Sequence, residues 1–404
     1  MWELIQANKR KSIILIISMG ILLVLLGYII GSAYIPDGGG LAGVFIALML
    51  WGVLYLISYT RGSKILLAVS GAKEITKDMH PQLYNIVEEM KIASGHPFMP
   101  KVYIIDSAAP NAFATGIKPD NTAIAVTAGL LGRLNRDELQ GVIAHEMAHI
   151  VNRDILFMTV SGIMLGVIVL ISEVFIYSLW FGGGGRYSKS SKDSGQGQII
   201  FIVIAIAFAI LAPIAARLLY FAISRKREYL ADASAVRFTR YPEGLASALE
   251  KISRSTEELK KANKVTAPMY IANPLKKKGK KLNDLTSTHP PISERIRILR
   301  GIAQSADFNA YQTAFNKVTG KETNIIPPAE LKDSTPINIR GAMGIPAIGL
   351  TKKQTQRNVG NLIMKLNDYS FINCKCGVKI KIPPDYKKKN VFCPRCGREH
   401  KLSN

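Results

Sequence analysis

Two of the six histidines lie in the pentapeptide His145-Glu146-Met147-Ala148-His149, which matches the pattern H-E-x-x-H. On a helix, residues four positions apart share one face, so both imidazoles can bind a single Zn²⁺. Glu146 then lies beside the metal-bound water, whose pKa zinc lowers to about 7, and can take its proton as the water attacks a carbonyl. The alternative is a fortuitous histidine pair on one helix face. The pattern predicts metal-assisted hydrolysis.

A catalytic zinc needs a third protein ligand, and Glu228 is the best candidate. His149 lies eight residues before Phe157, where one apolar segment begins. Glu228 lies six residues after Ala222, where another apolar segment ends. On continuous helices these offsets are roughly 12 Å and 9 Å, so the two side chains reach a matching depth if the segments form a hairpin. Asp232, one turn further, can accept the other N–H of a ligand histidine; the alternative is an acidic pair that balances neighbouring arginines.

Four apolar segments must position these residues. Each is 18 residues or longer and carries at most one charge, so each is long enough to cross about 30 Å of hydrocarbon as a helix. A buried core helix is the alternative, but it fits shorter segments better. A cleaved signal peptide would account for the first segment alone. The predicted membrane helices are Ser12–Tyr34, Leu41–Ser58, Phe157–Phe181 and Ile199–Ala222.

Basic residues flank these segments on one side of the predicted membrane. They lie at Lys9–Lys11, at Arg61 and Lys64, and at Arg225–Arg227. The positive-inside rule assigns that side to the cytoplasm. We therefore expect a multi-pass protein of the cell (inner) membrane whose N-terminus, active site and C-terminal part are cytoplasmic. The Gly- and Ser-containing loop Gly182–Gln198 is expected on the opposite side as a flexible linker.

The composition excludes a wholly disordered chain, because 48% of the 404 residues are hydrophobic. The formal net charge is +23, and from Ile223 onward Lys and Arg outnumber Asp and Glu by 35 to 15. Runs such as Lys276–Lys281 and Lys387–Lys389 are either a solvated basic face or a surface for anionic lipid head groups. Nucleic acid is the least favoured partner, because no aromatic residues alternate with the basic runs.

Four cysteines near the C-terminus form two pairs, each followed by glycine. Cys374 and Cys376 are separated by one residue, and Cys393 and Cys396 by two. Such pairs are typical of a small ribbon around a structural zinc with four thiolate ligands, although C-x-C is tighter than the usual spacing. Two disulfides are the alternative, which a reducing cytoplasm disfavours. Prolines and glycines in Ser334–Gly360 predict a linker before this ribbon.

The chain resembles the HtpX-like membrane-embedded zinc metallopeptidases, which are relatives of the CAAX-processing membrane proteases. The resemblance extends from about Gly71 to about Ile302 and is carried by four segments in order. They are Pro110–Gly116, His145–Asp154, Ser224–Asp232 and a final segment that holds Thr288-His289-Pro290-Pro291 and Arg295-Ile296. The cysteine-containing tail departs from the short members of the family.

The resemblance implies that His145, His149 and Glu228 bind a catalytic zinc and that Glu146 is the general base. It also implies hydrolysis of peptide bonds in membrane proteins at the cytoplasmic face. The biological role that the resemblance implies is quality control of misfolded membrane proteins, as part of a stress response. His289 either donates to the developing oxyanion or forms a structural turn before the adjacent prolines.

Further residues gain an expected role from the resemblance. Asn111, Ala112 and Phe113 correspond to the strand edge that holds the substrate, where an extended peptide adds by main-chain hydrogen bonds. The alternative for Asn111 is a turn residue. Asp154 either supports a ligand histidine or caps the third membrane helix.

The predicted fold is α+β and mainly α, with four transmembrane helices, a cytoplasmic gluzincin-like metallopeptidase domain and a small four-cysteine zinc ribbon. A catalytically silent zinc-binding scaffold and a CAAX-type prenyl-protein protease are the competing functions. Intact Glu146 argues against the first, and four spans are few for the chamber that the second needs. The predicted parts are an N-terminal hairpin (1–59), two peptidase parts (60–156 and 223–333) around a second hairpin (157–222), a linker (334–360) and the ribbon (361–404).

Overall fold

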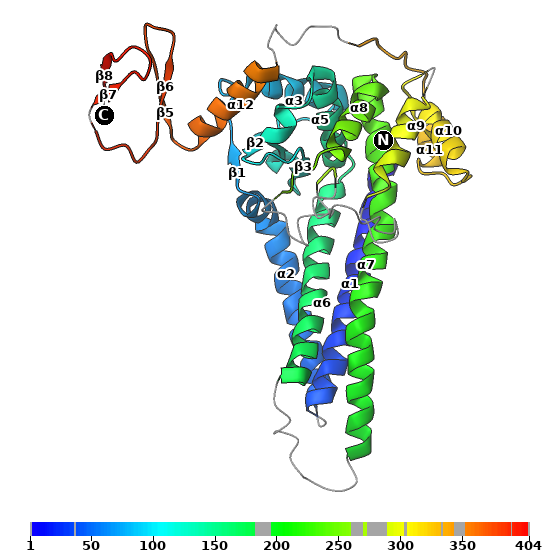
Figure 1. Cartoon of the computed structure of the whole chain (residues 1–404). Helices are drawn as coiled ribbons and strands as arrows, with labels where there is room; N and C mark the ends of the chain where they lie inside the picture. The colour runs from blue at the N-terminus through cyan, green and yellow to red at the C-terminus, as the bar shows by residue number, and fades with distance from the viewer. Residues whose placement is uncertain are drawn as a thin grey trace.

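Four long helices lie side by side and carry a mixed α/β portion at one end (Figure 1). They are α1 (Trp2–Tyr34), α2 (Gly39–Val69), α6 (Asp154–Phe181) and α7 (Gly195–Thr239). The computed structural model describes residues 2–35, 38–181, 195–259, 270–272, 289–302, 305–332, 334–342, 352–388 and 390–402. Most of the loop predicted at Gly182–Gln198, and the basic run Lys276–Lys281, lie outside the described residues.

Each long helix contains a stretch that is long and apolar enough to cross a membrane. The mean hydropathy of these stretches lies between 2.2 and 3.0, and only 17% of the α2 window is buried inside the protein. Outward-facing side chains such as Leu41 and Trp180 are 76% and 81% exposed, as lipid-facing residues of a membrane helix would be. Each of the four predicted spans overlaps one of these stretches, which are Ser12–Tyr34, Gly39–Val69, Met158–Trp180 and Ile202–Leu219.

Helices α1 and α2 pack against each other through glycines spaced four residues apart. A Cβ atom on Gly31 would lie 2.1 Å from the backbone oxygen of Gly39, and one on Gly43 would lie 2.0 Å from that of Gly27. Only glycine leaves room for backbones at this separation. Close approach of this kind is a common way for membrane helices to associate, because small residues allow extensive van der Waals contact.

A four-stranded sheet lies next to the ends of the membrane helices. Its strands are β1 (Ala72–Glu74), β2 (Lys101–Ile105), β3 (Ala112–Thr115) and β4 (Ala123–Thr127), in the order β1-β2-β4-β3. β2 and β4 are parallel, whereas β1 and β3 are antiparallel to their neighbours. β3 is therefore an edge strand of the sheet. Between β3 and β4 lies a short 3-10 turn, η1 (Pro119–Asn121).

Helices cover the face of the sheet that carries Val102, Ile124 and Ala114. α3 (Pro81–Ser94), α4 (Ala128–Leu131) and α5 (Arg136–Val151) contribute side chains to the same core cluster. The opposite face, with Phe113 and Ala125, packs against apolar residues of the membrane helices. The sheet thus joins the core beneath α3, α4 and α5 to the helical bundle.

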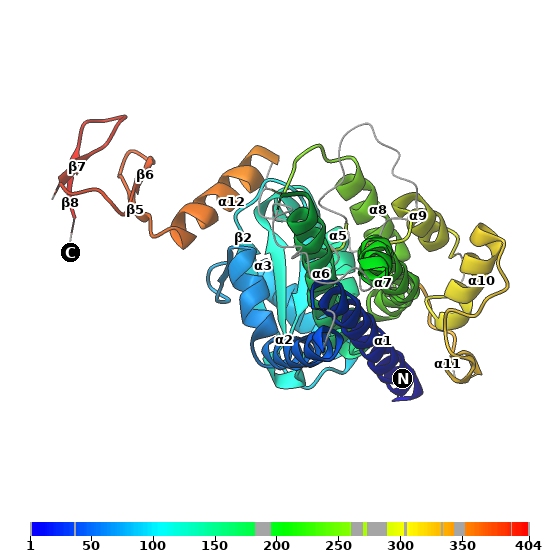
Figure 2. The ribbon, with the colours of Figure 1, turned by 90° about the horizontal axis from the view of Figure 1, so that it is seen from below.

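Further helices of this end of the molecule are α8 (Pro242–Ser253), α9 (Ile292–Arg300), α10 (Phe308–Thr319) and α11 (Pro328–Lys332). They form a layer in which α8 contacts α5, α9 and α10 contact α7, and α11 contacts α10. Seen along the bundle, the sheet and α3 lie on one side of α7, and α9, α10 and α11 lie on the other (Figure 2). Protein therefore lies on both sides of α7 at this end of the bundle.

The C-terminal region differs from the predicted linker. Ile337 accepts a backbone hydrogen bond from Ala306, and Arg340 donates to Asp137 and Gln140 on α5, so the first part of 334–360 is packed on the core around α5. The last part of that range belongs to α12 (Lys352–Leu366), which crosses the predicted boundary at 360. Two hairpins follow: β5 (Ser370–Asn373) with β6 (Lys379–Ile382), and β7 (Asn390–Phe392) with β8 (Glu399–Lys401).

Candidate active site

Helix α5 carries three of the predicted site residues. Its first turn is fixed by a capping box between Asn135 and Glu138. The residues His145, Glu146 and His149 are 0%, 1% and 5% exposed. Since a helix has 3.6 residues per turn, the two histidines lie on one face, and their ring centroids are 4.8 Å apart.

Glu228 comes from α7, which continues beyond the fourth membrane span to Thr239. The Nε2 atoms of His145 and His149 are 3.2 Å apart. The two carboxylate oxygens of Glu228 lie 3.6 Å and 3.5 Å from these nitrogens. Tetrahedral zinc with bonds of about 2.0–2.1 Å to nitrogen and oxygen would hold its ligand atoms about 3.3 Å apart. The structure thus brings together the three predicted ligands with spacings and donor types that fit zinc.

An acidic side chain orients each histidine. His145 Nδ1 lies 2.9 Å from Asp232 Oδ1, and His149 Nδ1 lies 3.2 Å from Asp154 Oδ2. Each carboxylate accepts a hydrogen bond from the Nδ1–H of its histidine, so the Nε2 lone pair of each ring is directed at the shared point between the histidines and Glu228. Of the two alternatives for Asp154, the structure places it against the ligand histidine while it also begins α6.

Arg295 is a residue of the site to which the sequence alone assigns no role beyond its place in a motif. It is fully buried, and its guanidinium forms a two-pronged contact with Asp232 at 2.8 Å and 2.7 Å. The same group lies 3.3 Å from Glu228 and 3.4 Å from His145 Nδ1. Arg295 follows Ile292 by three residues and precedes Leu299 by four, so a charge on the apolar stripe of α9 was the available signal.

Glu146 lies beside the edge strand β3. Burial raises the pKa of its carboxyl above the usual range, while the nearby His145 and a hydrogen bond from the backbone of Ala114 act in the opposite direction. Its Oε1 atom is buried and has no hydrogen-bond partner among the described residues. A carboxylate with one uncommitted oxygen at a histidine pair suits proton transfer to or from a small molecule held there.

The carboxylates beside the histidines favour a positive charge at this position. Burial alone would lower the pKa of His149, but the carboxylates of Asp154 and Glu228 raise it to about 10. Burial alone would raise the pKa of Glu228, but His289, the ligand histidines and Arg295 hold it well below its usual range. Glu228 is therefore ionised throughout the physiological pH range, as a metal ligand must be.

His289 lies at the margin of this group. Its Nε2 is 3.8 Å from Glu228 Oε1, and its side chain is 4% exposed. Burial lowers the pKa of His289, and Arg295 acts in the same direction. A neutral imidazole at this position can donate one hydrogen bond into the site.

The predicted substrate edge is covered in this structure. Asn111, Ala112 and Phe113 are 4%, 0% and 2% exposed. The side chain of Asn111 contacts Ala272, and the ring of Phe113 packs edge-to-face on Tyr270 with centroids 5.1 Å apart. These residues therefore surround the site on the side of β3 but do not line an open groove.

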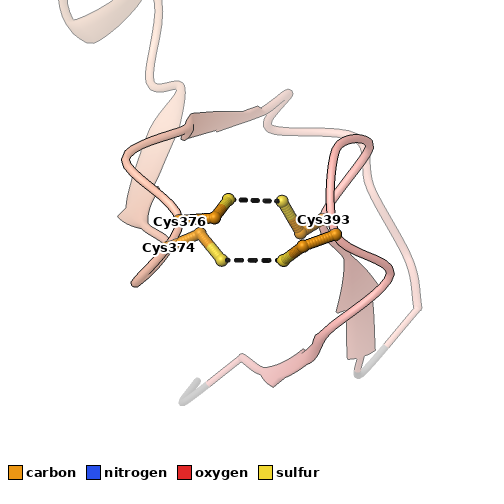
Figure 3. A group of neighbouring side chains, drawn as sticks. Cys374, Cys376 and Cys393 are labelled. Atoms are coloured by element: carbon orange, nitrogen blue, oxygen red, sulfur yellow. Dashed lines mark hydrogen bonds between the residues drawn. The ribbon is translucent and has the colours of Figure 1, made fainter.

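The four cysteines form a second cluster, remote in sequence from the first. Cys374 Sγ lies 3.5 Å from Cys396 Sγ, and Cys376 Sγ lies 3.5 Å from Cys393 Sγ (Figure 3). All four sulfurs lie within 4.8 Å of one another, and none is in a disulfide. The turns that present them depend on glycines with φ of 84° and 70°, at Gly377 and Gly397.

Comparison with known proteins places the peptidase part in a described group. The sequence profile of Peptidase family M48 matches residues 78–303. The protease HtpX homologue of Dictyoglomus thermophilum is 46% identical over 299 residues, which cover 74% of this chain and 94% of that protein. The protease HtpX homologue of Lactobacillus helveticus is 41% identical over 300 residues, which cover 74% of this chain and 99% of that protein.

Among solved structures, the crystal structure of S. mikatae Ste24p is similar to this chain with a TM-score of 0.41 and 22% sequence identity. The match covers 74% of this chain and 67% of that one. The cysteine cluster lies beyond the residues matched to the family profile, which end at 303.

Proposed function

The chain belongs to peptidase family M48 and is an HtpX-like multi-pass membrane metalloendopeptidase, and from this premise we propose a site and a mechanism for it. The proposed reaction is hydrolysis of peptide bonds in membrane proteins at the cytoplasmic face, with protein quality control as its purpose. The observation that carries the site assignment is the convergence of His145, His149 and Glu228 from two helices, beside the uncommitted carboxylate oxygen of Glu146.

His145 Nε2, His149 Nε2 and the Glu228 carboxylate would hold the catalytic zinc. Bound there, zinc would polarise the substrate carbonyl and acidify a water. Asp232 and Asp154 hold the two imidazoles in the required tautomer through their Nδ1 atoms. Arg295 offsets the charge of Asp232 and Glu228, so that the acids can be buried together.

Glu146 accepts the proton of the attacking water at its free Oε1 and passes it to the leaving amine. Its raised pKa, which burial causes, brings it closer to the operating pH and makes both transfers easier than for an exposed carboxyl. His289 donates a hydrogen bond to the oxygen that becomes negative during attack. The substrate is held in extended form by the edge of β3 at Asn111, Ala112 and Phe113.

The membrane orientation follows from the distribution of basic residues. The basic residues that flank the spans lie at the same end of the bundle as the site, and the positive-inside rule assigns that end to the cytoplasm. We therefore infer that the N-terminus, the site and the C-terminal part are cytoplasmic. The basic C-terminal half then faces anionic lipid head groups of the inner leaflet. Substrates that emerge from the bilayer reach the site at the inner end of the helical bundle.

We further infer that the cysteine cluster holds a structural zinc. Zinc–thiolate bonds of about 2.3 Å in a tetrahedral site separate the sulfurs by close to 3.8 Å, and the two 3.5 Å contacts are compatible with that spacing. The two hairpins bury few side chains, among them Ile380 and Ile382, so a metal would supply much of their stability.

Replacement of Glu146 by Gln tests the mechanism. The variant keeps the volume of the side chain and all proposed ligands, so we expect full zinc content and a cleavage rate lower by at least about a hundredfold. Cleavage of unfolded β-casein by the purified protein and metal analysis of the same sample give the two readouts. Glu243→Gln, at an exposed carboxyl on α8, is the control and should cleave like the wild type. Undiminished cleavage by Glu146→Gln would contradict the assignment of the base.

A further inference from the structure

The segment Tyr270–Ala272, called the covering segment below, lies on the outer side of β3. Its three residues are 1%, 2% and 8% exposed. The N–H of Ile271 donates to the backbone oxygen of Ala112 at 3.0 Å. The side chain of Asn111 forms two hydrogen bonds with the backbone of Ala272. Its Nδ2 donates to the backbone oxygen at 2.9 Å, and its Oδ1 accepts from the backbone N–H at 3.3 Å.

The contact with Ala112 uses a free main-chain group of the sheet edge. Thr127 N–H donates to the backbone oxygen of Asn111 at 2.9 Å, so these two residues form a hydrogen-bonded pair across β3 and β4. Hydrogen-bonded and non-hydrogen-bonded pairs alternate along an antiparallel ladder. Ala112 and Ala114 therefore direct their N–H and C=O groups away from β4. An extended peptide that adds to β3 must bind through these same groups.

The covering segment is also tied to the proposed catalytic groups. Arg295 Nη1 donates to the backbone oxygen of Ile271 at 3.3 Å and lies at the same distance from Glu228 Oε2. The neighbouring outward residue of β3, Ala114, is hydrogen-bonded through its backbone to Glu146. A peptide on this edge would thus run beside the base, along the path that the covering segment occupies.

Aromatic contacts hold the first residue of the segment. The ring of Tyr270 packs on Phe113, and its hydroxyl donates to Ser70 Oγ at 3.3 Å. The groups that would cut a peptide are 5% exposed or less, so a polypeptide cannot reach them while these contacts persist.

We propose that the covering segment is an intramolecular occupant of the substrate edge and that a substrate must displace it. The proposal rests on the proposed function, since this edge matters only if Glu146 and the metal ligands act on a peptide held there. The segment and the substrate compete for the backbone oxygen of Ala112. The apparent affinity for substrate is then the intrinsic affinity reduced by the fraction of molecules whose edge is free.

Hydrogen exchange of the full-length protein tests the displacement directly. The Glu146→Gln variant is used, so that bound unfolded β-casein is not consumed and the result does not depend on catalysis. Without casein, we expect the amides of the covering segment to exchange slowly. With saturating casein, they should exchange faster, because Ile271 N–H loses its acceptor. Exchange that stays slow or slows further on addition of casein would show that casein does not displace the covering segment, and this result would overturn the proposal.

Activity of Ile271→Pro gives the second readout. Proline removes the N–H that binds Ala112, and one hydrogen bond of this kind is worth roughly a fivefold change in an equilibrium. We expect kcat/KM for casein to rise about fivefold through a lower KM, with kcat unchanged. Ile271→Ala is the matched control, since it trims the side chain but keeps the N–H, and it should change KM less.

The outcomes separate the two proposals. A fall in kcat/KM for Ile271→Pro, in protein that unfolds at the wild-type temperature, would overturn the covering role. If Ile271→Pro does not fold, the exchange experiment decides alone. If the zinc-loaded wild type cleaves no polypeptide, the proposed function fails, whereas faster exchange with casein would still support displacement of the segment.

Discussion

At the scale of single residues, the site is a set of buried charges that neutralise one another. Asp232, Glu228 and Arg295 are 0–2% exposed and lie within hydrogen-bonding or ion-pair distance. A buried charge is costly unless a partner of opposite sign compensates it. Arg295 is therefore required to keep two acids beside the histidines in ionised form.

Replacement of Arg295 by Met should destabilise the protein strongly. The change keeps an unbranched side chain but leaves Asp232 and Glu228 without their cation, a loss of about 3–5 kcal/mol in the free energy of unfolding. Urea titration of the purified protein, followed by tryptophan fluorescence, measures the loss. Arg295→Lys keeps the positive charge but lacks the planar guanidinium that binds Asp232 with two hydrogen bonds. Its free energy of unfolding should therefore lie between those of the Met variant and the wild type. A Met variant as stable as wild type would mean that Arg295 has no such role.

Sequence reasoning found part of this residue set. His145 and His149 follow from their spacing, and Glu228 from its depth below a membrane span, because both arguments use regular helix geometry. The role of Arg295 could not be derived in this way, because its partners Asp232 and His145 lie 63 and 150 positions earlier in the chain. Pairings over such separations depend on tertiary packing, which leaves no periodic pattern in the sequence.

At the scale of elements, α1 supports the site although it carries none of the proposed ligands. Its Ser12 accepts a hydrogen bond from Arg227 at 2.9 Å. Arg227 in turn lies 3.4 Å from Asp154, which orients His149. The position of α1 depends on its glycine contacts with α2, and a shift there reaches His149 through three side chains.

Replacement of Gly31 by Ala should therefore lower both stability and activity. The added Cβ would lie 2.1 Å from the backbone oxygen of Gly39, and overpacking of this kind costs about 1–3 kcal/mol. Gly52→Ala is the matched control in α2, because a Cβ there meets nothing within 4 Å, and alanine favours the helix by about 0.5–1 kcal/mol. Thermal unfolding in detergent and casein cleavage provide the measurements. Equal unfolding temperatures and equal cleavage rates of the two variants would exclude a tight α1–α2 contact.

The elements of the membrane part were more predictable than those of the tail. Long apolar runs identify spans regardless of context, and all four were found. Ser334–Gly360 was predicted to be a linker because of its prolines and glycines, yet α12 begins within this range, at Lys352. Leu362, Ile363 and Leu366 give α12 a helical apolar stripe, which the many basic residues around it obscured. Arg340 contacts Gln140 of α5, which lies 200 positions earlier in the chain, so no local sequence pattern predicts this contact.

At the scale of the whole molecule, the chain joins two units that each offer a candidate metal site. The peptidase core is large and tied to the bundle, so zinc at His145, His149 and Glu228 would serve chemistry more than folding. The C-terminal hairpins have a small core, and zinc there would serve folding. α12 connects the units, and Lys73 donates to the backbone oxygen of Leu366 at its end.

Metal content separates these two roles. We expect two zinc ions per full-length chain and one per chain truncated after Ala342, a position that keeps the docked Arg340 and removes α12 and the cysteines. The truncated protein should still cleave casein, because residues 78–303 contain the part matched to the peptidase family. Glu228→Ala in the truncated protein should then abolish both its zinc and its cleavage, since three protein ligands fall to two.

The full-length protein with Cys393→Ser and Cys396→Ser supplies the control for truncation. It should also hold one zinc and retain cleavage, while its C-terminal hairpins lose protection from proteolysis, because a structural zinc site supplies folding energy to the residues around it. Two zinc ions in the truncated chain would place the second metal outside the cysteines. One zinc in the full-length chain that disappears on truncation would leave the histidine site without metal as purified. Zinc added back to that protein would then have to restore cleavage for the catalytic assignment to stand.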